Sequence, residues 1–152
     1  MKVRTLILIL ILAQGCDTGI VVHDQKRAAD LVIDFLSSLK SAEGIELAYA
    51  WTDDRYKQEI SATEFVRIVA RIRNLNQRAK IHLGGYETFG PVELLNIYAS
   101  SSTDEGQLYF RFVLSGSKSS DYYLLNLDVS DTVFSPEGTY RTFTDAISVD
   151  GV

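Results

Sequence analysis

The spacing of apolar residues changes once along the chain, close to Asn74. Before that point they recur every three or four residues, which places them on one side of a helix. The first such stripe contains Ala28, Leu31, Val32, Phe35, Leu36 and Leu39. After that point they alternate with a period of two, which is typical of strands with one buried face. Helices followed by strands predict an α+β fold, with N-terminal helices packed on one face of a curved antiparallel sheet.

The helical half divides into three predicted segments. Asp24 is a suitable N-cap for the first, and residues 41–44 are expected to end it. A shorter helical stretch follows over residues 45–51. Ser61-Ala62-Thr63-Glu64 has the pattern of a capping box and is expected to open the next helix. The buried stripe predicted for that helix is Phe65, Ile68, Val69 and Ile72.

Three segments of the second half alternate clearly, with connections at 101–106 and 115–121 that are rich in Ser, Gly and Asp and suit hairpins. The predicted inward set is Leu95, Ile97, Ala99, Leu108, Phe110, Phe112, Leu114, Tyr123, Leu125, Leu127 and Val129. Weaker strands are expected at residues 81–83 and 139–143. Gly84-Gly85 is interpreted as a bulge or a tight turn.

The N-terminus has the build of an export signal. Lys2 and Arg4 precede a Leu/Ile run at residues 6–12, which is shorter than the roughly 20 apolar residues that cross a bilayer. Ala13-Gln14-Gly15-Cys16 resembles the bacterial lipoprotein signal, in which a small residue precedes a cysteine that becomes the first residue of the mature chain. The resemblance implies a diacylglycerol thioether on Cys16, usually with a third acyl chain, such as palmitate, on its amine. The alternatives are a cleaved secretory protein without lipid, and a buried strand with an ordinary thiol.

This interpretation divides the chain into a signal peptide at 1–15, a lipidated tether at 16–23 and a single domain at 24–152. Two or more acyl chains hold a protein firmly on a membrane, at about 0.8 kcal/mol per buried CH₂. The expected location is therefore the extracytoplasmic face of the cell membrane. Asp17 follows the cysteine. In a Gram-negative organism an aspartate there implies retention in the inner membrane, facing the periplasm.

Composition excludes several functions. Lys2 and Arg4 are the only charged residues among 1–15, so the remaining chain has 13 basic and 20 acidic residues, a net charge of −7. That charge argues against nucleic acid and against electrostatic binding of anionic headgroups. Cys16 is the only cysteine, so the domain can form neither an internal disulfide nor a cysteine zinc site. No motif for a metal, a cofactor or a phosphate-binding loop is present in the sequence, and none of these ligands is expected.

The order of elements resembles the nuclear-transport-factor-2-like superfamily, a cystatin-like α+β cone, and within it the small bacterial lipoproteins that carry this domain. The residues that carry the resemblance lie at 28–36, 46–49 and 60–65, and Glu137-Gly138-Thr139-Tyr140 stands where many members have Asp-Gly-x-Trp. The resemblance covers about residues 24–145. It implies a cone in which some members hold catalytic Asp, His or Tyr, and a sheet face through which members often dimerise.

No acid–base catalyst is predicted inside this cone. The inward positions of the three clear strands carry no carboxylate and no histidine. His82 lies on a weaker strand and is able to point inward, whereas His23 belongs to the tether. A lone histidine without an oriented partner is more often an ordinary strand residue.

Two surfaces are candidates for binding. A basic patch without acidic residues comprises Arg67, Arg71, Arg73, Arg78 and Lys80. These cations either neutralise the C-terminal dipole of a helix, which is the favoured interpretation, or meet an acidic partner or a headgroup. The outward face of the sheet is expected to present a candidate interface of Leu94, Tyr98, Tyr109, Arg111, Val113, Tyr122 and Leu124. Tyr and Arg are enriched at interface centres, but Tyr and Val are also strong strand formers on a solvated face.

The sequence thus predicts a membrane-anchored, non-enzymatic lipoprotein that binds a protein partner, or a second copy of itself, through its sheet face. The alternative is a cone pocket that binds a small molecule or works as an isomerase or dehydratase.

Overall fold

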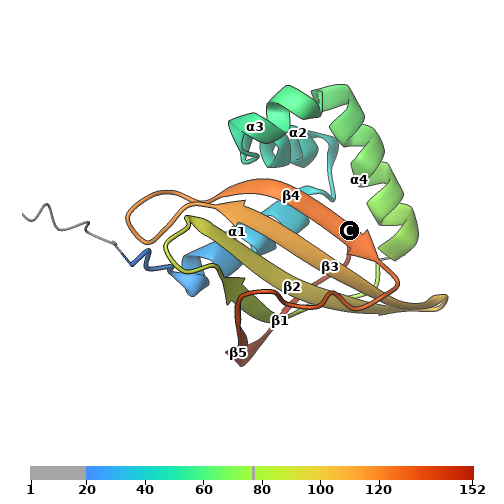
Figure 1. Ribbon diagram of the computed structural model, residues 1–152. Helices are drawn as coiled ribbons and strands as arrows, with labels where there is room; N and C mark the ends of the chain where they lie inside the picture. Colours follow the sequence, from blue (N-terminus) through green and yellow to red (C-terminus); the bar gives the residue numbers. More distant parts are fainter. Residues whose placement is uncertain (1–19, 77) are drawn as a thin grey trace, which may run out of the picture.

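The computed structural model describes residues 20–76 and 78–152 as an α+β fold (Figure 1). The predicted signal peptide and Cys16 lie outside these residues. The helices are α1 (Gln25–Ser38), α2 (Ala42–Ala50), α3 (Asp54–Glu59) and α4 (Ala62–Asn76). The strands are β1 (Ile81–Thr88), β2 (Leu94–Thr103), β3 (Gly106–Ser115), β4 (Tyr123–Ser130) and β5 (Thr139–Val149).

The helix starts follow from local capping. The side chain of Asp24 accepts a hydrogen bond from the Arg27 amide, and Ser61 does the same for Glu64, which confirms both predicted N-caps. The break after α1 is shorter than expected, because Ser41 caps α2 and Gly44 lies inside that helix. A Cβ on Gly44 would overlap the carbonyl oxygen of Ser38, so this close approach of two helices requires glycine.

The sheet is antiparallel and open, with the strand order β4-β3-β2-β1-β5. Strands β4 and β5 are consecutive in the chain but lie at opposite edges. The connection between them, residues 131–138, therefore has to cross the sheet. It crosses the face opposite the helices, where Phe134 contacts Tyr98 and Arg111. We call residues 131–138 the crossover segment and the face that it crosses the outer face.

The core lies between the helices and the inner face of the sheet. The ring of Phe35 meets the edges of Phe65 and Phe112, at centroid distances of 6.2 and 6.4 Å. The predicted inward residues of β2 and β3 between Leu95 and Leu114 are buried, apart from the half-buried Leu108. The helices cover an apolar inner face, as the two periodicities predicted.

The predicted orientation of the first residues of β4 is wrong. Leu114 pairs with Leu124 while Val113 pairs with Asn126, so Leu125 is an extra residue that forms a bulge. The bulge reverses the alternation before it. Tyr122 and Leu124 point into the core, with 7% and 2% of their surface exposed, whereas Tyr123 is 43% exposed.

Strand β1 runs farther than predicted, because Gly84-Gly85 bends the strand without ending it. The register shifts between Leu83 and Gly85, which confirms the bulge. A Cβ on Gly85 would collide with the hydroxyl of Tyr140 on β5, so glycine is needed where these strands pair. The strand then continues to Thr88 and carries Glu87 onto the outer face.

Replacement of Phe112 by Ala should destabilise the fold by about 3–5 kcal/mol, because the fully buried ring leaves a cavity between β3 and α1. Chemical denaturation measures the change. Tyr123→Ala, on the exposed side of β4, is the control and should change stability by only about 0.5 kcal/mol. Equal effects of the two substitutions would contradict the placement of the core.

Candidate functional site

Five residues of the predicted interface lie on the outer face. Leu94, Tyr98, Tyr109, Arg111 and Val113 are half-buried there. Tyr98 pairs with Arg111 across β2 and β3. Tyr122 and Leu124 do not belong to this surface, because the bulge at Leu125 turns them inward.

The crossover segment covers part of this surface, which the sequence did not predict. The ring of Phe134 lies beneath the guanidinium of Arg111, 5.0 Å from the ring centroid. Tyr98 packs against Phe134 and Tyr140, at centroid distances of 6.5 and 5.7 Å. Arg111 also donates two hydrogen bonds to Asp128, at 2.9 and 2.7 Å. Tyr98 and Arg111 therefore have partners within their own chain.

A buried carboxylate fixes the end of the crossover segment. Only 1% of Glu87 is exposed, and its oxygens accept hydrogen bonds from the amides of Glu137 and Gly138. The side chains of Asn96 and Tyr98 donate to the same carboxylate. Nothing in the sequence marks Glu87, because the glycine pair before it was expected to interrupt the strand.

The pKa values of Glu87 and Tyr98 are shifted in opposite directions. Burial alone would raise the pKa of Glu87, but the hydrogen bonds from Tyr98, Gly138, Asn96 and Glu137 outweigh burial and hold the pKa below its ordinary value. Burial, together with the bond to Glu87, raises the pKa of Tyr98 to about 12. At neutral pH Glu87 is a carboxylate and Tyr98 a phenol. This arrangement suits a structural lock better than proton transfer.

An open apolar cavity of about 350 Å³ lies between the crossover segment and the sheet. We call it the outer groove. It is lined by Tyr98, Ala99, Tyr109, Phe110, Val133, Phe134, Pro136 and Tyr140. Val133 is 64% exposed and Tyr140 is 41% exposed, so apolar and aromatic side chains face solvent at its rim. The volume falls within the range of ligand sites.

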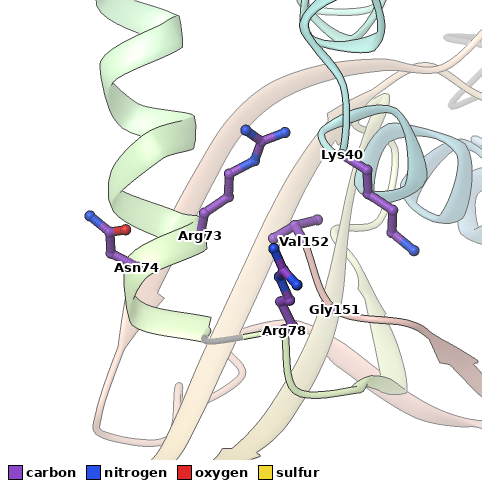
Figure 2. A pocket seen from close by; sticks show the side chains of 6 residues that line it. All are labelled: Lys40, Arg73, Asn74, Arg78, Gly151 and Val152. Atoms are coloured by element: carbon purple, nitrogen blue, oxygen red, sulfur yellow. The ribbon is translucent and has the colours of Figure 1, made fainter.

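The predicted basic patch divides into two parts. Arg73 and Arg78 line a cleft of about 620 Å³ at the end of α4, together with Lys40, Asn74, Gly151 and Val152 (Figure 2). We call it the basic cleft. Arg73 also donates to the carbonyl of Leu39, which caps α1. Arg67, Arg71 and Lys80 are exposed and do not line the cleft.

Neither histidine lies inside the core. His82 is exposed and pairs in register with Ser100 and Ser148, so the inward orientation that its strand allowed is not adopted. His23 lies before α1, 3.4 Å from the hydroxyl of Tyr122. Desolvation by burial lowers the pKa of His23, which keeps its ring neutral at pH 7.

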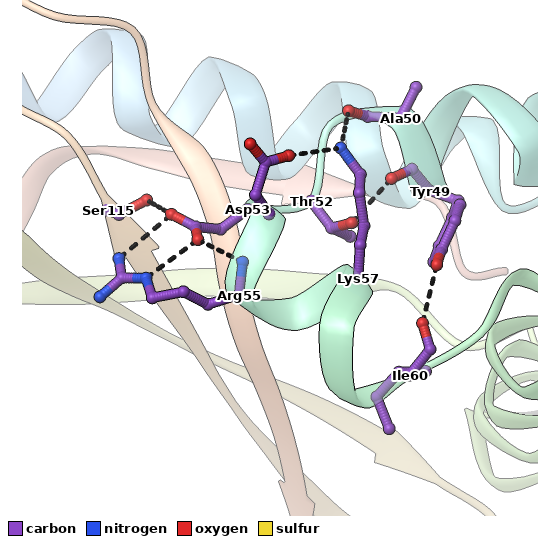
Figure 3. Close-up of polar contacts among 9 residues, drawn as sticks. Tyr49, Ala50, Thr52, Asp53, Arg55, Lys57, Ile60 and Ser115 are labelled. Atoms are coloured by element: carbon purple, nitrogen blue, oxygen red, sulfur yellow. Dashed lines mark hydrogen bonds and ion pairs between the residues drawn. The ribbon is translucent and has the colours of Figure 1, made fainter.

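A polar junction joins the helices to the sheet (Figure 3). Helix α3 was not predicted from the sequence. The carboxylate of Asp53 caps this helix and accepts hydrogen bonds from Arg55 and Ser115. The hydrogen bond from Arg55 is the main reason why the pKa of Asp53 lies well below its ordinary value. The amide of Asp53 donates to the carbonyl of Leu124, at 2.8 Å. This perturbed carboxylate is committed to holding α3 against β3 and β4.

Within residues 20–76 and 78–152, no group of three or more His, Cys, Asp and Glu side chains has a geometry that could hold a metal ion. In the same part of the chain no helix has both the length and the apolar character needed to cross a bilayer. Comparisons with protein-family models, with curated proteins and with solved structures give no match.

Glu87→Gln should lower the free energy of unfolding by about 2–3 kcal/mol at pH 7. The two carboxylate oxygens of Glu87 accept hydrogen bonds from four donors, and the substitution removes the charge and replaces one of these oxygens by an NH₂ group that cannot accept. Denaturation at several pH values measures the effect. The pKa of Glu87 is lowered on folding from its ordinary value of 4.5, so its charge stabilises the fold above that pH and this contribution is lost as the pH falls further. The difference between wild type and variant should therefore shrink in acid. A difference that does not depend on pH would contradict this role of the charge.

Proposed function

We propose that the protein is a lipid-anchored extracytoplasmic binding domain that takes a protein partner in the outer groove. The observation that carries this proposal is the groove itself, an open aromatic cavity on a face that no helix covers within residues 20–76 and 78–152. Aromatic side chains supply large contact areas at low entropic cost and dominate many interface energies. The proposed occupant is an apolar segment of another protein.

The groove is suited to binding because its walls are held in place. Glu87 accepts hydrogen bonds from the amides of Glu137 and Gly138 at the end of the crossover segment. Arg111, which is paired with Asp128, packs against the ring of Phe134 and holds it in place. A site whose side chains are already ordered loses little entropy when a partner binds. A stable complex buries about 800 Å² on each partner. The exposed side chains of Val133 and Tyr140 would lie at the apolar centre of such a contact.

The contacts of the segment before α1 bear on the proposed anchor. The carbonyl of Val22 accepts a hydrogen bond from the Lys118 amide, and the Asp24 amide donates to the hydroxyl of Tyr122. These bonds hold the segment before α1 against the connection between β3 and β4. Four residue steps separate Cys16 from Ile20, which span at most roughly 14 Å. A lipid on Cys16 would therefore keep this end of the domain close to the bilayer.

The nuclear-transport-factor-2-like family is the proposed ancestry. Its support is the order of helices before strands and the packing of the helices on one face of an open antiparallel sheet. The enzymatic or ligand-binding cone is the weaker alternative, because residues such as Ile97 and Phe112 fill the inner face without exposed surface.

Cys16→Ser should abolish lipid attachment and leave an unprocessed precursor or a soluble protein, because serine has no thiolate for thioether formation. Membrane fractionation and mass spectrometry of the N-terminal peptide measure the outcome. Wild-type protein with an intact N-terminus and a free thiol on Cys16 would contradict the anchor.

A charge in the outer groove should prevent partner binding. We expect Tyr109→Asp and Val133→Asp each to reduce recovery of the partner about tenfold or more, because an unpaired carboxylate would be buried in an apolar contact. Cross-linking and pull-down from native membranes, together with light scattering for self-association, measure the effect. Val66→Asp, at a similarly exposed valine on α4, is the matched control and should leave binding intact. Equal recovery and an unchanged oligomeric state in all three variants would contradict the groove as the binding site.

A further inference from the structure

The basic cleft lies where two helices end. Helix α1 finishes at Ser38, two residues before Lys40, and α4 finishes at Asn76, two residues before Arg78. Figure 2 shows the side chains of Lys40, Arg73 and Arg78 around Gly151 and Val152. Helix α1 is 14 residues long, so the cleft is about 21 Å from the end at which the proposed tether enters.

The three cations of the cleft have no acidic side chain as a partner in the described part of the chain. The ion pairs there join other residues, namely Lys26–Asp30, Arg27–Asp121, Arg55–Asp53, Lys57–Asp54 and Arg111–Asp128. Lys40 and Arg78 are exposed, and Arg73 is half-buried. The cleft therefore concentrates positive charge in a protein with a negative net charge.

Helix dipoles explain only part of this charge. Each helix C-terminus carries about half a negative charge, so the ends of α1 and α4 together offset about one of the three positive charges. The surplus is about +2. With a carboxylate at Val152 counted as well, it is still about +1. Dipole neutralisation accounts for Arg73, whose guanidinium donates to the Leu39 carbonyl at the end of α1. It leaves Lys40 and Arg78 available to a ligand.

The walls of the cleft are fixed by a buried polar contact. Asn76 is fully buried; its amide group donates to Ser101 at 2.9 Å and accepts from the Val152 amide at 3.3 Å. These bonds join the end of α4 to β2 and to the segment after β5. Arg78 has a φ of 62°, a left-handed conformation that is uncommon for a residue with a side chain. Such outliers occur often at functional sites.

We propose that the basic cleft binds a phosphate group, presented either by a soluble phosphate ester or by a phospholipid headgroup. Arginine offers paired N–H donors that match phosphate oxygens, and lysine adds a compact positive charge. The volume of about 620 Å³ exceeds that of a single phosphate, so the site has room for an attached organic group. The net negative charge of the chain, −5 over its full length, does not prevent binding, because charges farther away than about 8 Å are screened at physiological salt.

The test is a titration of the full chain in nonionic detergent, followed through backbone amide shifts by NMR. One arm adds inorganic phosphate and glycerol 3-phosphate, and the other adds phosphatidylglycerol to the micelles. We expect saturable shifts at Arg78, Gly151 and Val152, and an affinity that falls at least about tenfold in the double variant Lys40→Ala/Arg78→Ala. Arg78→Lys should retain part of the affinity because the charge is kept.

The control is the double variant Arg67→Ala/Arg71→Ala, which removes two exposed arginines of α4 outside the cleft. It should bind as tightly as the wild type. Shifts in the first arm identify a soluble phosphate compound and shifts in the second arm alone identify a headgroup, and both support the site. The proposal is overturned if neither arm gives saturable shifts, or if the two double variants lose affinity equally. Neither result depends on the anchor or on the outer groove.

Discussion

The structure of the outer face depends on the hydrogen bonds that the buried carboxylate of Glu87 accepts. Strands β4 and β5 lie at opposite edges of the sheet, so the chain has to pass over it between them. Backbone that crosses a sheet face needs partners for its amides, and Glu87 supplies them for Glu137 and Gly138. Asn96 and Tyr98 complete the shell around the charge, which makes a buried carboxylate tolerable.

The two faces of the sheet are consequently different in kind. The inner face is apolar and is closed by the helices, with Phe35, Phe65 and Phe112 in edge-to-face contact. The outer face combines a charged lock with aromatic rings, and the crossover segment covers only part of it. A closed face stabilises the fold, whereas a partly covered aromatic face is available for recognition.

The long axis of α1 separates two further regions. At its N-terminal end, Val22 and Asp24 are tied to the connection between β3 and β4 and to Tyr122. At its C-terminal end, Lys40 after α1 lines the same cleft as Arg73 and Arg78 at the end of α4, and Arg73 donates a hydrogen bond to the carbonyl of Leu39. The proposed anchor and the proposed phosphate site therefore lie at opposite ends of α1. The outer groove lies on the sheet, apart from both.

Local pattern was enough to predict the class of fold, the caps at Asp24 and Ser61 and the buried faces of α1, α4, β2 and β3, because each depends on residues a few positions apart. The alternation did not predict the bulge at Leu125. One extra residue exchanges the two sides of a strand, so Tyr122 and Leu124 point inward where the sequence predicted them outward. The partners of Glu87 in the crossover segment lie 50 and 51 residues away, and Lys40 is more than 30 residues from Arg73. Contacts at such separations follow from the strand order and from the packing of helix ends, which no local spacing encodes. The tertiary structure alone therefore decided that the outer face carries a locked, partly covered groove and that three of the chain's cations share one cleft.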